Sequence, residues 1–525
     1  MNRNNHLPPF FCDEFFRRKN RRDTPGDGRK IWRRNIFRRT AVGTAIVTTI
    51  SLHFSAMNFS AVKTRRDFLG TLSTGLGGIA LASLFQRESF AATAPHFPPK
   101  AKRVIQLFMN GGASQCDLFD YKPQLIARHG QKFDPGNGAR VEASISVPGA
   151  VMRSPFGWAR HGQCGRWVSS ALPHLARHVD DMAFLMAMQS VSNVHGPASY
   201  LQTSGFLLPG FPCAGAWISH ALGSLADNVP AFVALPDARG LPYNGRSAFT
   251  SGFLPANHQG TIINASAPQP MTHLQPPAGA THITPASRAG GLALLREMNA
   301  AHAAERPGDS RLTARIESYE LAARLQLSAP ELLDLAGETD ATKKLYGLDQ
   351  PETADFGKRC LLARRMAERG VRFVQVWSGQ GGGADNWDNH TDIAKELGVA
   401  ARRMDQPAAA LLMDLKARGL LEDTLLVWTT EFGRMPFSQG SVGRDHNGGT
   451  FVSWFAGAGI KNGASFGESD EWSWKAVEGV TTSYDFHATI LHLLGIDHEK
   501  LSFRHSGIDR RLTDVHGRVI REVLA

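Results

Sequence analysis

Cysteine is scarce in this sequence and never arranged as in a metal site. Five cysteines are spread over 525 residues, and no two of them form a Cys-x-x-Cys pair. A zinc cluster built on cysteine pairs is therefore excluded. A disulfide between two of the last four stays open for an exported chain, as do buried free thiols. The five are Cys12, Cys116, Cys164, Cys213 and Cys360.

Most of the chain also lacks a charge surplus. The sequence carries 58 Lys and Arg against 47 Asp and Glu, and residues 1–66 alone hold 15 of the basic and 4 of the acidic ones. The remainder, 67–525, has 43 of each and no net charge. A nucleic acid is excluded as a partner, because the basic character is confined to the N-terminal segment.

The N-terminal segment lacks a convincing membrane anchor. The weakly apolar stretch Ala41–Met57 contains Thr, Ser and His, so we expect no stable transmembrane anchor there. Downstream, the order Arg65-Arg66-Asp67-Phe68-Leu69, a glycine-rich uncharged run from 70 to 85 and small residues at 91–94 are typical of a twin-arginine export signal. We expect a signal peptide at 57–94 and a periplasmic or secreted protein.

Residues 1–56 precede the usual position of such a signal. Met57 stands eight residues before the arginine pair and is an alternative start of the protein. In that interpretation, residues 1–56 are a basic extension that does not belong to it. The remaining residues, 95–525, are predicted to form one α/β domain with an insertion around 255–345.

Apolar strand-like runs alternate with helix-like segments through the rest of the chain. This alternation predicts a mostly parallel central sheet flanked by helices. A helix is also predicted near 167–178, and another at 407–418 with Pro407 in its first turn. The expected strands are 102–109, 182–188, 232–235, 373–377, 425–428 and 451–456.

The segment 423–446, DTLLVWTTEFGRMPFSQGSVGRDH, carries the most chemical information. A buried strand is predicted to end at Glu431, and a polar loop then supplies Asp445 and His446. Parallel sheets carry their sites at the carboxyl ends of the strands. The alternative from the residues alone is an ion pair between Glu431 and Arg434, with Asp445 and His446 capping a turn.

Polar residues follow three other predicted strands as well. Carboxylates and imidazoles that converge from separate strands are what a divalent-metal hydrolase needs. Asp388 and His390 are close enough in sequence to supply two ligands from one loop. The three groups are Asp117 with Asp120, His195 alone, and Asp385 with Asp388 and His390.

Several motifs resemble the domain of unknown function 1501 family, proteins of twin-arginine-exported, often planctomycete type. They include NVHGPASYLQTSG, NWDNH, TEFGR, GRDHNGG and DFHATILHLLGIDHEKL, and the likeness covers nearly all of 67–525. That family is placed in the alkaline phosphatase and sulfatase superfamily, so the resemblance implies that fold. The chain departs from the superfamily at Asn110 and Phe432, where an Asp and a metal-binding His would stand. His195 stands where a sulfatase has its modified Cys.

The resemblance and the polar loops together imply a set of site residues. The predicted ligands of a divalent metal (Zn, Ca, Mg or Mn) are Asp388, His390, Glu431, Asp445 and His446. His195 is a candidate nucleophile or ligand, with a structural histidine as the alternative. Arg434 or Arg444 is expected to hold a substrate anion through its planar guanidinium.

Two functions remain open at this point. The first is an exported metal-dependent hydrolase of sulfate or phosphate esters, acting on a small molecule or a polysaccharide and lacking the sulfatase nucleophile. The second is a non-catalytic envelope protein of the same fold that binds a polysaccharide, an anion or a protein partner. The retained Asp, Glu and His residues favour the first, whereas Asn110 and Phe432 favour the second.

Overall fold

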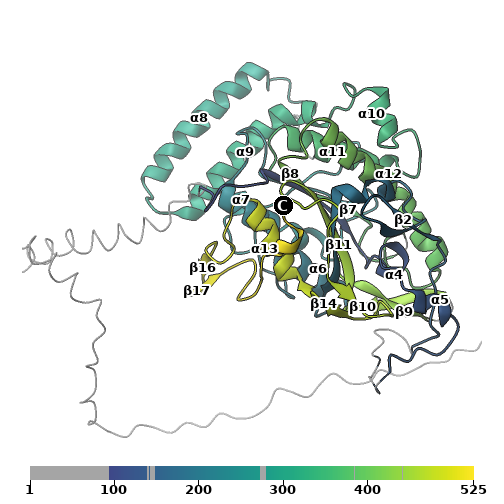
Figure 1. The fold of residues 1–525 in the computed structure, drawn as a ribbon. Coiled ribbons are helices and arrows are strands. Elements are labelled where there is room, and N and C mark those ends of the chain that lie inside the picture. Colours follow the sequence, from purple (N-terminus) through teal and green to yellow (C-terminus); the bar gives the residue numbers. More distant parts are fainter. Residues whose placement is uncertain are drawn as a thin grey trace, which may run out of the picture. The chain divides into compact units, whose positions relative to one another are not determined.

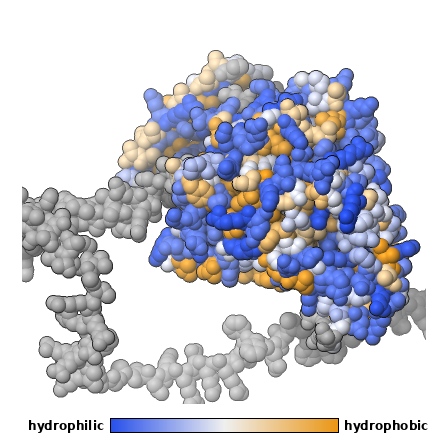
Figure 2. Space-filling view, in the orientation of Figure 1, coloured by the Kyte–Doolittle hydropathy of each residue, from blue (hydrophilic) through white to orange (hydrophobic). Residues whose placement is uncertain are grey.

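A computed structural model describes residues 94–136, 138, 141, 148–271, 279–383, 385–439 and 442–525. These residues belong to one compact unit, Ser89–Ala525. The predicted extension and nearly all of the predicted export signal lie outside the described residues. Within the described part of the chain, no helix is long and apolar enough to cross a membrane. Figure 2 shows a face on which hydrophilic and hydrophobic residues are mixed.

A nine-stranded sheet in the order β12-β4-β11-β8-β1-β7-β5-β6, with β15 beside β4, forms the centre of the fold. Every strand pair in it is parallel except the two that involve β11. This confirms the predicted mostly parallel sheet. The strands are β1 (Arg103–Met109), β4 (Met182–Gln189), β5 (Phe232–Leu235), β6 (Thr261–Ile262), β7 (Phe373–Ser378), β8 (Thr424–Thr429), β11 (Phe451–Gly457), β12 (Ser465–Phe466) and β15 (Thr481–Thr482).

Helices cover both faces of the sheet (Figure 1). The central strands β7 and β8 are buried along their whole length, as expected of strands packed on both sides. Alternate residues of β1 enter two separate cores: Leu107 packs on one face and Phe108 on the other. The first core is completed by α11 (Ala354–Glu368) and α12 (Ile393–Ala417), the second by α7 (Ala214–Leu222) and α13 (Ser483–Leu493).

Shorter elements surround this core. The helices are α4 (Gln115–Leu118), α5 (Pro123–Ala127), α6 (His195–Ser204), α8 (Pro285–Ala304), α9 (Ser310–Leu333) and α10 (Asp340–Leu345), with 3₁₀ turns at Leu175–Asp181, Gly245–Phe249, Ala256–His258 and Arg521–Val523. Four two-stranded sheets are formed by β2 (Trp158–His161) with β3 (Arg166–Ser169), β9 (Gly433–Gln439) with β10 (Gly443–Asn447), β13 (Glu468–Ser469) with β14 (Ala476–Glu478), and β16 (Phe503–His505) with β17 (Ile508–Arg510).

Three local predictions were wrong. The segment near 167–178 is not one helix: its first residues pair with β2 as strand β3, and only its last residues are helical, in the 3₁₀ turn Leu175–Asp181. Pro407 lies inside α12 rather than in its first turn. An internal proline costs about 3 kcal/mol, and the buried stripe of α12, which includes Leu397, Met404 and Leu411, offsets that cost. The expected polar loop after Glu431 is the β9–β10 hairpin.

The antiparallel orientation of β11 brings this hairpin to the carboxyl ends of the parallel strands. No crossover helix separates β8 from β11, since only β9 and β10 lie between them, and neighbouring strands joined without a crossover run antiparallel. The start of β11 therefore lies at the edge where the parallel strands β1, β4, β7 and β8 end. Residues that follow those strands and residues that precede β11 meet there.

A buried ion pair fixes the hairpin to the first βα turn. Arg444 on β10 donates from Nε and Nη2 to the two carboxylate oxygens of Asp117 on α4, at 2.7 and 3.0 Å. Both side chains are fully buried. Arg444 also donates to the carbonyl oxygens of Met435 and Met152, and Ser114 donates to Asp117. Removing one partner would leave the other charge buried and unpaired.

We therefore expect Arg444→Met to lower the free energy of unfolding by about 3–5 kcal/mol, measured by urea denaturation. Asp117→Asn combined with Arg444→Met should recover part of the loss, because no buried charge remains. Arg504→Met is the matched control, since its pair with Asp509 is exposed and should be worth no more than about 1 kcal/mol. If Arg444→Met and Arg504→Met lost equal free energy of unfolding, the Asp117–Arg444 pair would not have the special role assigned to it.

Candidate metal centre

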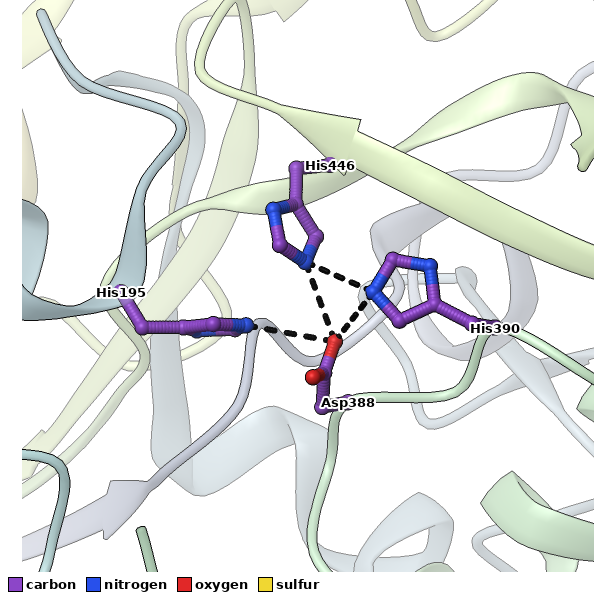
Figure 3. A group of neighbouring side chains, drawn as sticks. All are labelled: His195, Asp388, His390 and His446. Carbon is purple, nitrogen blue, oxygen red and sulfur yellow. Dashed lines mark hydrogen bonds and ion pairs between the residues drawn. The ribbon is translucent and has the colours of Figure 1, made fainter. Parts of the chain in front are cut away.

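Four side chains converge at the edge of the sheet: His195, Asp388, His390 and His446 (Figure 3). Each offers one nitrogen or oxygen atom, and these atoms lie within 4.8 Å of one another. His195 begins α6 after β4, Asp388 and His390 follow β7, and His446 lies on β10 just before β11. Three separate segments of the fold are thus needed to assemble the group.

Each of the three imidazoles is held at Nδ1 by an oxygen acceptor outside the group. A neutral imidazole that donates from Nδ1 has its lone pair on Nε2, the atom that binds a metal. All three Nε2 atoms then present a lone pair to the centre. The pairs are His195 Nδ1 with Glu431 Oε1 at 2.7 Å, His446 Nδ1 with the carbonyl oxygen of Asn193 at 2.8 Å, and His390 Nδ1 with Gln439 Oε1.

The three Nε2 atoms surround a single carboxylate oxygen. Asp388 Oδ1 lies 2.7 Å from His390 Nε2, 3.0 Å from His446 Nε2 and 3.2 Å from His195 Nε2. His390 Nε2 and His446 Nε2 are themselves only 2.8 Å apart. Four atoms with lone pairs thus crowd one small volume.

The proton inventory of this group fits a cation at its centre. His195 Nε2 is buried and lies 3.2 Å from Asp388 Oδ1. Burial lowers the pKa of His446 to about 4, and the charge of Arg434 adds to that against the opposing effect of Asp388. His446 is therefore neutral and has a single N–H, although both of its nitrogens face oxygen atoms. A metal ion bound by the Nε2 atoms and Asp388 removes this conflict.

Asp388 is held in its charged form. Burial alone would raise its pKa, but hydrogen bonds with His195, His390 and His446 and the charge of Arg434 hold the pKa well below its usual range. Burial would likewise lower the pKa of His195, yet hydrogen bonds to Asp388 and Glu431 raise it overall. The site thus combines a permanent carboxylate with imidazoles of opposite pKa tendency, as in many functional sites.

Glu431 supports the group and is not one of its four members. Its Oε1 accepts from His195 Nδ1 and, at 2.9 Å, from the backbone N–H of Gly111, while Thr430 Oγ1 donates to Oε2. A carboxylate behind an imidazole fixes the ring orientation and strengthens the ligand. Gly111 is required here, because a Cβ atom at that position would meet the backbone of Trp387 and Asp388 at 2.6–2.8 Å.

The structure does not place the other predicted residues in the group. Asp445 is buried where the register of the β9–β10 pair shifts, and its Oδ1 accepts from the His446 N–H. Asp117 pairs with Arg444, and Asp120 accepts from Ser469 and Ser473.

Both arginines predicted to hold an anion are already engaged. Arg444 is committed to Asp117 and two carbonyl groups. Arg434 is fully buried, and each of its three guanidinium nitrogens has acceptors inside the protein. Neither side chain is therefore positioned to grip a substrate anion. The acceptors of Arg434 are the carbonyl oxygens of Gly111, Gly112, Trp387 and Arg444, Asp388 Oδ1 and His390 Nε2.

Tyr243 contacts the group and was not predicted. Its ring stacks on the ring of His195 with centroids 4.2 Å apart and planes 1° from parallel. Its hydroxyl lies 3.2 Å from Asp388 Oδ2. Tyr243 follows β5, so the rule that sites lie at strand ends could have found it, but the residues after 235 offered no carboxylate–imidazole pair to attract attention.

Solvent reaches the group through Asp388 and His390, whose side chains are 21% and 23% exposed. A pocket of about 430 Å³ lies beside Asp388. Asp385, Asp392 and Glu396 line it together with a single cation, Lys395. Its surroundings are therefore predominantly acidic.

Solved structures of low sequence identity share parts of this fold. The lipoteichoic acid synthase LtaP from Listeria monocytogenes is 10% identical, with a TM-score of 0.38, over 83% of this chain and 80% of that chain. The sulfatase PsFucS1 from Pseudoalteromonas sp. is 12% identical, with a TM-score of 0.33, over 81% and 72%. Alkaline phosphatase from the Antarctic bacterium TAB5 is 11% identical, with a TM-score of 0.30, over 75% and 98%. Likeness at this level carries nothing about activity.

No curated protein matches the sequence. A family model does match it, over residues 101–524, and its description is "Protein of unknown function (DUF1501)". The match spans nearly all of the described chain, from β1 to the C-terminus, and includes every residue of the candidate metal centre. The chain therefore belongs to the DUF1501 family.

Proposed function

We propose that this protein is an exported metal-dependent hydrolase of sulfate or phosphate esters. One observation carries the proposal: three imidazoles, each held at Nδ1 by an oxygen acceptor, direct Nε2 toward Asp388 Oδ1. Such anchoring is typical of metal-ligating histidines. The twin-arginine pattern at 64–69 supports export. That route carries proteins that have already folded, which suits a protein that acquires its metal before export.

The ligand set favours a transition metal. Imidazole suits Zn and neighbouring transition metals, whereas Ca and Mg prefer sites made of oxygen. With three nitrogen donors and one carboxylate, Zn fits best among the four metals expected from the sequence. Bound there, a divalent ion supplies Lewis acidity, which polarises an ester and acidifies water.

The chain's own residues prepare the centre. Glu431 fixes the His195 ring, and Tyr243 packs against that ring and contacts Asp388. The three imidazoles and Arg434 together keep Asp388 ionised. Asp388 and His390 are the members most exposed to solvent. An ester would therefore approach from their side.

A non-catalytic metal protein is the second candidate, and one observation favours it. Arg434 and Arg444 have their guanidinium donors engaged inside the protein, and the pocket beside Asp388 is acidic. A substrate sulfate or phosphate would thus depend on the metal for its neutralisation. Four protein ligands can also close a tetrahedral structural site.

Metal analysis and ester hydrolysis separate the two. We expect the purified protein to hold about one equivalent of a transition metal and to hydrolyse p-nitrophenyl sulfate or p-nitrophenyl phosphate until it is treated with a chelator. If the protein bound metal but hydrolysed neither ester, the hydrolase proposal would be refuted and the non-catalytic metal protein would be favoured. Absence of metal after reconstitution with Zn, Mn, Mg and Ca would refute both.

We expect His390→Ala to lower metal affinity by at least about 100-fold, because a direct ligand should matter more than the supporting groups worth 10–100-fold. Isothermal titration with Zn would measure it. The matched control is His302→Ala, an exposed histidine on α8. Metal binding that survives in His390→Ala at full affinity would place the metal elsewhere.

Glu431→Gln should weaken metal binding by about 10–100-fold without removing it, since the amide keeps the shape of the carboxylate but not its charge behind His195. Thermal denaturation with and without Zn reports the change independently of activity: the stabilisation by metal should shrink while the metal-free protein stays folded. An unchanged affinity would mean that Glu431 has no role in holding His195 for the metal.

A further inference from the structure

A second pocket, of about 520 Å³, lies beside β4 and β12 at one side of the sheet. It is bounded by the residues after α4, by β3 and by the segment from β12 to β14, and Met186 of β4 forms part of its lining. It shares no lining residue with the candidate metal centre. Its volume falls in the range of small-molecule sites.

Aromatic rings form one wall of this pocket. Tyr121 and Trp167 line it, with ring centroids 4.3 Å apart and planes inclined by 30°. Trp158 on β2 extends the cluster, with its ring centroid 5.6 Å from that of Tyr121. All three rings are only partly buried, although aromatic side chains gain most from full burial. A partly open aromatic wall offers a flat apolar surface to the C–H face of a sugar ring.

Arg166 supplies a cation at the inner side of the pocket. Its Nη1 donates to Ser465 Oγ at 3.1 Å and contacts Met186 Sδ, and its guanidinium lies 5.3 Å from the ring of Phe184. Among the described residues no carboxylate lies within ion-pair distance of it. The charge of Asp120, which also lines the pocket, offsets part of the cost of burying this guanidinium. A bound carboxylate or sulfate would lower that cost further through a bidentate contact.

Two carboxylates face each other at the pocket rim. Glu468 on β13 lies directly opposite Glu478 on β14 in an antiparallel pair, and both side chains are exposed and line the pocket. Like charges directly opposite in such a pair destabilise a sheet. Their arrangement is suited to accept hydrogen bonds from the hydroxyl groups of a ligand.

We propose that this pocket binds an acidic saccharide unit. The sugar ring packs against the Tyr121 and Trp167 wall, its carboxylate or sulfate meets Arg166, and its hydroxyl groups donate to Glu468 and Glu478. This site is independent of the metal centre, so a polysaccharide can be held here whether or not the other site hydrolyses it.

Isothermal titration with methyl glucuronide and methyl glucoside tests the proposal. We expect the glucuronide to bind about ten-fold more tightly, the effect of one charged hydrogen-bonded contact. Arg166→Gln should abolish this difference, and Arg166→Lys should restore part of it. Binding of neither sugar, or equal binding of both, overturns the proposal.

His390→Ala separates this site from the metal centre. The variant should bind methyl glucuronide as the unaltered protein does, because His390 lies outside the pocket. Loss of sugar binding in this variant would assign the sugar to the metal centre and refute a second site. Failure of ester hydrolysis would leave the expected sugar binding unchanged.

Glu478→Gln gives a readout that a purely structural pocket would not. Relief of the repulsion with Glu468 should raise the thermal midpoint, while loss of an acceptor should weaken glucuronide binding about three- to ten-fold. Glu297→Gln, an exposed glutamate on α8, should change neither quantity. A higher midpoint with unchanged sugar affinity would remove the glutamates from the binding site.

Discussion

The candidate centre depends on how the negative charge of one carboxylate oxygen, Oδ1 of Asp388, is compensated. Asp388 Oδ1 lies within 3.2 Å of three imidazole nitrogens and 2.6 Å from Arg434 Nη2. A carboxylate in such a place needs opposite charge and hydrogen bonds to remain ionised. Arg434 supplies both, and its other donors are used to fix the backbone of Gly111, Gly112 and Trp387. Arg434 thus adds to the effect of the three imidazoles on the charge of Asp388 and also fixes the loops that carry the centre.

Topology explains how three distant segments reach this oxygen. His195, Asp388 and His390 come after parallel strands, whose carboxyl ends share one edge of the sheet. His446 comes before a strand, and it reaches the same edge only because β11 is antiparallel. The register of the hairpin shifts between Arg444 and His446, where two steps along β10 face the four steps from Ser438 to Arg434 on β9, and such irregularities re-aim side chains. Arg444 turns to Asp117, whereas His446 faces the metal centre.

Local hydrophobic pattern was sufficient for most of the sheet but not for the hairpin. The apolar runs at 102–109, 232–235 and 425–428 coincide with β1, β5 and β8, because strands buried on both faces are apolar throughout. GRMPFSQ and GRDHN contain proline, glycine and charge, so their pairing depends on partners that no local pattern reveals. The same holds for WARH and RWVS, which pair as β2 and β3.

Site residues were predictable where an imidazole or a carboxylate stood at the end of a predicted strand. The roles of the two hairpin arginines were not predictable, because like residues can pair with different partners. His195, Asp388, His390 and His446 were identified as imidazoles or carboxylates at strand ends, and all four come together. Arg434 and Arg444 lie on paired strands and look equivalent in sequence, yet one contacts Asp388 and the other Asp117. Because burial removes water as an alternative partner, each guanidinium must be satisfied by carbonyls and a carboxylate within reach. Asp388 and Asp117 each use one of the two arginines. Neither arginine of the hairpin therefore remains to bind a substrate anion.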